Sequence, residues 1–202
     1  MQHRVLSLSS LSLWVRLLIA FALGLLLGIT AFTSASDALL QWVPIVVLLF
    51  AMMVSITFDE RVVKRHISTS RIVYGCAMVL LAMVVVFLVV SFLLGIVPSF
   101  SFLTTLLIAL ELGIGVGFAV GNEENGASNL SGLVAWAGTA MLLLIATGIQ
   151  ARIPGSKLGA VYSTIVTVAV IGLGFAVLGG LLGRYLRIWI MRRVVGEDEE
   201  ES

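Results

Sequence analysis

Residues 72–96 read IVYGCAMVLLAMVVVFLVVSFLLGI, an apolar run that contains no charged side chain. A helix needs roughly 20 apolar residues to cross about 30 Å of bilayer hydrocarbon, so this run is long enough to span a membrane. The strands of membrane barrels are only about 10 residues long and alternate between apolar and polar positions. The run has neither property, and we therefore predict that it forms a transmembrane helix.

Similar apolar stretches recur along the whole chain. Together with the first run they cover residues 13–33, 38–57, 72–96, 102–120, 131–150 and 158–190. The connections between them are short, which favours antiparallel neighbours in a single bundle. The sequence therefore predicts an all-α fold, a polytopic transmembrane bundle of about six helices. We expect one domain over residues 1–193, followed by an acidic, disordered cytoplasmic tail at 194–202.

The composition leads to the same class of protein. Of the 202 residues, 60% are hydrophobic and 11% are charged, and a globule of this size has too little interior to cover so much apolar surface. The net charge of +1 gives no general attraction to nucleic acid. The single cysteine, Cys76, excludes an intramolecular disulfide and a zinc site built on several thiolates. We expect no metal site and no cofactor.

The basic residues predict the orientation of the bundle. With the N-terminus in the cytoplasm, ten of the twelve Lys and Arg residues fall on the cytoplasmic side, where membrane proteins concentrate them. These ten are Arg4, Arg16, Arg61, Lys64, Arg65, Arg71, Arg184, Arg187, Arg192 and Arg193. Only Arg152 and Lys157 fall outside. We therefore predict a multi-pass protein of the cell membrane with both termini inside.

The first apolar stretch permits a second interpretation. It follows a basic start and ends near the small residues Ser34, Ala35 and Ser36, which resemble a signal-peptide cleavage site. Its apolar region is at the long end for a signal peptide, and we therefore favour a span. A mature N-terminus at Ser36 or Asp37 would remove this helix from the bundle.

Glu111 is the candidate site residue of this sequence, because it lies near the middle of the stretch 102–120. An ionised carboxylate that faces lipid is costly, so the side chain should face protein or be protonated. Two roles are open: a proton or cation site, or a protonated group that hydrogen-bonds across helices. Gly115, one turn further along, is expected to leave space beside the carboxyl group.

Small residues at spacings of about four let helix backbones approach each other closely. Such stripes occur in the first, fourth and sixth stretches and comprise Gly24, Gly28, Gly113, Gly117, Gly121, Gly172, Ala176 and Gly180. We interpret them mainly as helix-packing positions, with a sliding or gating surface as the alternative. Gly180 and Gly183 are further expected to hold two copies of the chain together as a homodimer.

A polar segment at residues 121–129 separates the fourth and fifth stretches. Its candidate functional residues are Asn122, Asn125, Ser128 and Asn129. Glycine and amide side chains favour turns and helix caps, so a cytoplasmic loop is the simpler interpretation. The alternative is a helix break inside the membrane whose exposed backbone groups bind an ion or a substrate.

Two function classes agree with these features. The first is a small transporter or channel-like subunit that uses Glu111 as an intramembrane carboxylate. The second is a non-transport scaffold, assembly or sensory partner, because an aqueous path usually needs more than one buried polar group. An enzyme is not expected, since His3 and His66 both lie outside the apolar stretches and membrane proteases need a histidine base or ligand pair. The expected partners are the lipid bilayer and a second copy of the chain.

Overall fold

The computed structural model describes residues 12–34, 43–65, 67–93, 102–120, 127–153 and 158–196. Within these ranges all regular secondary structure is helical, and they contain no strand. The helices are α1 (Leu13–Ser34), α2 (Val43–Thr57), α3 (Glu60–Lys64), α4 (Thr69–Leu93), α5 (Phe102–Val120), α6 (Ala127–Ala151) and α7 (Leu158–Val195). The prediction of an all-α fold is therefore confirmed, and each of the six apolar stretches corresponds to one helix.

The helices differ from the sequence prediction at several ends, since α4 begins at Thr69 and not at residue 72, and α6 begins at Ala127 and not at residue 131. The short helix α3 was not predicted; its first turn is capped by Asp59, whose side chain accepts a hydrogen bond from the backbone N–H of Arg61. Helix α7 continues beyond residue 190 to Val195, and both Val194 and Val195 are buried. Helix α7 therefore includes the first two residues of the predicted tail. Residues 197–202 lie outside the described part of the chain.

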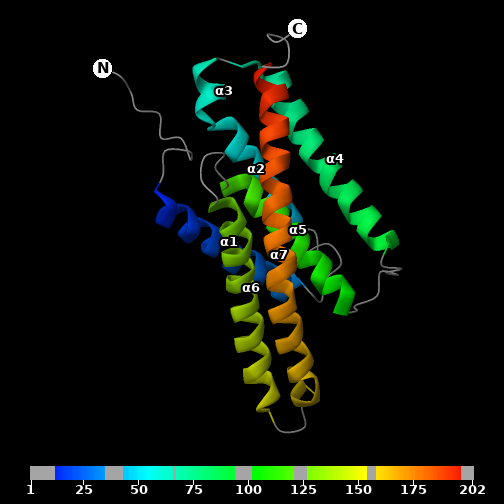
Figure 1. Ribbon diagram of the computed structural model, residues 1–202. Helices are drawn as coiled ribbons and strands as arrows, with labels where there is room; N and C mark the ends of the chain where they lie inside the picture. The colour runs from blue at the N-terminus through cyan, green and yellow to red at the C-terminus, as the bar shows by residue number, and fades with distance from the viewer. Residues whose placement is uncertain are drawn as a thin grey trace.

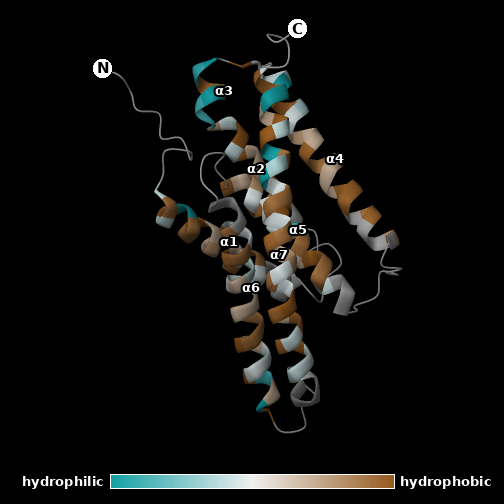
Figure 2. Cartoon of the chain, in the orientation of Figure 1, coloured by the Kyte–Doolittle hydropathy of each residue, from teal (hydrophilic) through white to brown (hydrophobic). Residues whose placement is uncertain are grey.

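Three helices contain segments long and apolar enough to cross a membrane, namely Thr69–Val86, Leu130–Ala151 and Tyr162–Val195. The apolar segments described in α1, α2 and α5 are shorter. Figure 2 shows apolar residues along all of these helices, whereas hydrophilic residues gather on α3, at the C-terminal end of α7 and at the C-terminal end of α6. This distribution is typical of a membrane protein.

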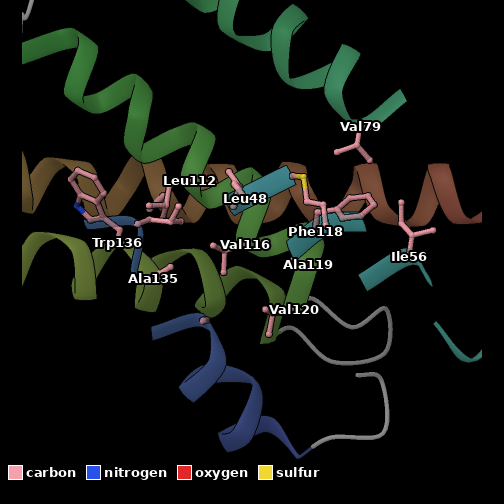
Figure 3. Close-up of a cluster of buried hydrophobic side chains, with 14 of the residues drawn as sticks. Leu48, Ile56, Val79, Leu112, Val116, Phe118, Ala119, Val120, Ala135 and Trp136 are labelled. Atoms are coloured by element: carbon pink, nitrogen blue, oxygen red, sulfur yellow. The ribbon is translucent and has the colours of Figure 1, made fainter. Parts of the chain in front are cut away.

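Helix α7 is the long axis of the molecule, and α5 and α6 pack along it (Figure 1). Helix α1 crosses α6, whereas α4 lies beside the C-terminal half of α7 and diverges from it toward the C-terminal end of α4. The buried core lies where α5 and α6 pack along α7 and where α2 packs against α5, as the side chains in Figure 3 show. At its edge, the Trp136 indole donates a hydrogen bond of 2.9 Å to the backbone oxygen of Ala169 and so joins α6 to α7.

The predicted small-residue stripes hold helices of one chain together. A Cβ atom on Gly113 or on Gly132 would collide with the backbone oxygen of Ala176, and one on Gly117 would come within 2.8 Å of the Cα atom of Gly180. Helices α5, α6 and α7 are therefore in backbone contact, as small residues permit. Helix α1 joins α6 in the same way, with Gly24 against Ala135, Gly28 against Thr139, and a 2.8 Å hydrogen bond from Thr139 to the oxygen of Gly24.

The role expected for Gly180 and Gly183 in a contact between two copies is corrected by this packing. A Cβ on Gly183 would collide with the backbone oxygen of Ile114, and Gly180 faces Gly117, so both glycines contact α5 of their own chain. The Trp136 ring likewise packs directly against Gly172. Gly174, by contrast, has nothing within 4 Å of the position of a Cβ atom. Gly121 lies outside the described residues.

Candidate functional site

Glu111 lies in the middle of α5, with part of its side chain covered by protein. Its Oε1 atom is buried and has no hydrogen-bond partner among the described residues. The space expected beside it is filled, because Leu48 of α2 packs directly against Gly115, one turn away on the same face of α5. One carboxyl oxygen therefore lies against protein without any compensating donor in the described part of the chain.

A second polar site, which sequence reasoning missed, lies further along α5. Phe118 follows Glu111 by seven residues, which places it on nearly the same face about 10 Å along the helix axis. Its backbone oxygen accepts a 2.7 Å hydrogen bond from the Arg187 guanidinium, whose carbon lies 5.9 Å from the centre of the Phe118 ring. The Phe118 side chain is buried.

Arg187 connects three segments of the chain at this point. Its Nη2 atom lies 2.8 Å from the Asp59 carboxylate, and its Nη1 atom also donates to the hydroxyl of Ser55 on α2. Both ends of the ion pair are buried, with Arg187 and Asp59 each 5% exposed. Since Phe118 is in the last turn of α5, the guanidinium also places a positive charge where the helix dipole is negative.

Two further arginines surround this ion pair. Arg61 contacts the other carboxylate oxygen of Asp59 at 3.3 Å and is itself one-third exposed. Arg16 of α1 is 3% exposed and lies close enough to Arg187 for their charges to repel. Arg16 and Arg187, which were used to assign the orientation, are therefore buried in the protein and do not lie at a solvated surface.

The C-terminal end of α7 is held by the segment around α3. Arg65 donates a hydrogen bond of 3.4 Å to the backbone oxygen of Val195. Gly196 has a φ of 80°, a left-handed conformation that ends the helix, and its N–H bonds to the oxygen of Arg192 at 2.9 Å. Basic side chains are favourable at a helix C-terminus, where the helix dipole is negative. Arg65 therefore joins Arg192 and Arg193 of α7 at this end of the molecule.

The remaining sequence candidates are only partly described. Asn122 and Asn125 lie outside the described residues, while Ser128 and Asn129 belong to the first turn of α6. Residues 121–126, which separate α5 from α6, lie outside the described part of the chain. In the described part of the chain, no three His, Cys, Asp or Glu side chains gather as a metal site would require.

Cavities open on the surface of the described helices at two places that bear on the site. The larger, about 580 Å³, lies between the ends of α6 and α7 beside Gly148, Arg152 and Tyr162. The smaller, about 280 Å³, lies between α4 and α7 over Ile114 of α5. Glu111 lines neither cavity. Comparison of the chain with protein-family models, with curated proteins and with solved structures found no match.

Proposed function

We propose that this chain is a multi-pass protein of the cell membrane, with six spans and both termini in the cytoplasm, and that it is a small transporter or channel-like subunit. Glu111 is the proton- or cation-binding group. The observation that carries the proposal is the buried Oε1 atom of Glu111, which has no hydrogen-bond partner in the described part of the chain. Buried polar groups in native proteins nearly always have partners, and ionisable groups inside a membrane are by default functional.

The arrangement of the basic residues supports the proposed orientation. Arg65 contacts Val195 at the end of α7, and α3 lies at the same end of the molecule as the C-terminal end of α7 (Figure 1). Arg152 lies near the opposite end, after α6. Reporter fusions at Ser68 and Ser156 test the topology: we expect Ser68 to be inside and Ser156 outside, and the reverse pattern would contradict it.

Proton movement through the purified protein tests the role of Glu111. Liposomes that contain the protein and a trapped pH-sensitive dye are given a membrane potential. In the wild type this potential should drive protons through the protein, alone or coupled to another cation, and the dye reports the change in internal pH. Glu111→Gln should abolish this flux and leave the fold intact, because the amide resembles the protonated acid in size and shape. The matched control is Glu60→Gln, since Glu60 is half exposed on α3 and pairs only with Lys64 among the described residues. Equal flux in all three proteins would contradict the proposal.

A chemical measurement separates a protonated Glu111 from an ionised one. Hydrophobic carbodiimides react with protonated carboxyl groups in apolar surroundings, and mass spectrometry locates the modified residue. We expect modification at Glu111 and none at Asp59, whose carboxylate is held by Arg187 and Arg61. Modification of Asp59 with no reaction at Glu111 would show that the wrong acid has been chosen.

A non-transport scaffold, assembly or sensory partner is the second candidate function. It is favoured by the absence of Glu111 from both described cavities and by the direct backbone contact of α5 with α6 and α7. A scaffold should show no flux in either the wild type or the Glu111→Gln variant. The homodimer expected from the sequence remains a prediction, which crosslinking in native membranes tests.

A further inference from the structure

Helices α4 and α7 form a wedge that is closed at one end and open at the other. Near the start of α4, a Cβ on Gly75 would come within 2.7 Å of Val194 and 3.5 Å of Ile190, so the two helices are in close contact there. Toward the C-terminal end of α4 the two helices diverge, as Figure 1 shows. The cavity of about 280 Å³ occupies this divergence, with Ala82 and Val86 on one side and Leu182 and Leu186 on the other. We call it the α4–α7 crevice.

The crevice is apolar, and its size suits a slender occupant. Ile114 of α5 forms the floor, and its other walls are aliphatic apart from the aromatic residues Tyr185 and Trp189. Pockets for compact small molecules usually begin at about 300 Å³, so a single hydrocarbon chain fits this space better. Tyr185 is 68% exposed and Trp189 is 42% exposed, and such aromatic side chains are enriched at the boundary between hydrocarbon and headgroups.

A positive charge lies directly beyond the aromatic end of the crevice. Leu182, Leu186, Trp189 and Arg193 follow at spacings that place them on one face of α7. The guanidinium carbon of Arg193 lies 4.4 Å from the centre of the Trp189 ring. Arg193 is exposed and forms no ion pair within the described ranges. The guanidinium therefore lies over the Trp189 ring, next to the aromatic end of the α4–α7 crevice.

We propose that the α4–α7 crevice binds one anionic phospholipid, with an acyl chain between Ala82 and Leu186 and the headgroup phosphate on Arg193. Charge complementarity selects this occupant, because guanidinium groups bind phosphate in a bidentate manner and basic residues at the cytoplasmic surface attract anionic lipids. The proposal shares only the membrane placement with the proposed function and requires no transport.

Lipid titration of the purified protein in detergent, followed by native mass spectrometry, tests this site. The probes are phosphatidylglycerol and phosphatidylcholine with identical acyl chains. The wild type should bind phosphatidylglycerol about fivefold more tightly than phosphatidylcholine, because one basic residue near an anionic surface contributes a factor of about this size. Arg193→Ala should lose this preference. The control Lys64→Ala removes an equal charge from an exposed side chain at the same end of the molecule, and it should keep the preference.

A second pair of variants tests the acyl-chain part of the site. Ala82→Phe should fill the crevice and weaken the binding of both lipids, whereas Val84→Phe places the same aromatic side chain on the exposed outer face of α4 and should bind like the wild type. Unchanged binding in Ala82→Phe would overturn the proposed chain position. If Lys64→Ala and Arg193→Ala lose the preference for phosphatidylglycerol equally, the preference comes from the total charge at this end of the molecule and not from a specific site. That result would overturn the proposal. Glu111→Gln should bind both lipids like the wild type, because Glu111 does not line the crevice. The lipid measurement therefore tests the crevice separately from the proposed role of Glu111 in flux.

Discussion

Glu111 and Asp59 are two acidic side chains that lie against apolar helices, and their surroundings are opposite. Asp59 is 5% exposed and is held by Arg187 at 2.8 Å and by Arg61 at 3.3 Å. The Oε1 atom of Glu111 is also buried, but it has no hydrogen-bond partner in the described part of the chain. A buried polar atom without a partner costs about 1–3 kcal/mol. The paired acid therefore has a clear role in the fold, whereas the unpaired acid has a cost that packing alone does not explain.

The largest effect is expected from breaking the pair that involves Asp59. Arg187→Met removes the main partner of a buried carboxylate and the donor to the oxygen of Phe118. Loss of one member of a buried ion pair usually costs about 3–5 kcal/mol, because the other charge stays buried. We expect a loss of this size in the free energy of unfolding, measured by titration with a denaturing detergent in mixed micelles.

The double variant Asp59→Leu with Arg187→Met is the control for this measurement. Replacing both charges by apolar side chains removes the uncompensated charge, and such replacements are often neutral. The double variant should therefore recover most of the stability lost in Arg187→Met. If it is as unstable as the single variant, the contacts of Arg187 with Ser55 and Phe118, and not its pairing with Asp59, stabilise this end of the bundle.

Glu111→Leu should have a smaller effect of the opposite sign. The substitution removes an unpartnered buried oxygen and replaces it with an apolar side chain of similar size, so stability should stay constant or rise by up to about 1–3 kcal/mol. The same change at the paired acid, Asp59→Leu alone, should destabilise the protein. Unfolding titrations of the two variants under identical conditions make this comparison. A clear loss of stability in Glu111→Leu would mean that its carboxyl group has a structural partner.

The sequence predicted the six longer helices well because each of them corresponds to a long and mainly apolar run. The bounds of α5 agree with the predicted stretch at both ends, since charged and turn-forming residues follow Val120 directly. The short α3 was missed because five residues form too short a segment for periodicity to be recognised. The packing role of Gly113 and Gly117 also followed from their spacing. Their partners, Ala176 and Gly180, were identified as packing residues but could not be assigned to a particular helix pair.

The buried ion pair could not be predicted from spacing, because its two members are 128 residues apart in the chain. Asp59 was not among the candidate residues, and Arg187 was interpreted only as a signal of orientation. Local signals were present: Ser55 and Asp59 are four residues apart at the end of α2, and Arg187 lies between Tyr185 and Trp189 inside an apolar helix. Only the packing of α2 and α5 against α7 brings these polar groups together. Glu111 was found because a carboxyl group in the middle of an apolar run is visible without tertiary structure.

The smallest effect is expected from Arg61, the second partner of Asp59. Arg61→Gln removes a contact of 3.3 Å made by a side chain that is 33% exposed. Ion pairs with an exposed member usually contribute less than about 1 kcal/mol, because water screens the charge and the side chain loses conformational freedom. Since Arg187 still neutralises the carboxylate at 2.8 Å, the free energy of unfolding should fall by no more than this amount. The measurement uses the same unfolding titration, repeated at low and high salt, because a screened pair should matter even less at high salt. A loss as large as that of Arg187→Met would show that the two arginines hold Asp59 as one unit, and the distinction between a buried and an exposed partner would then be wrong.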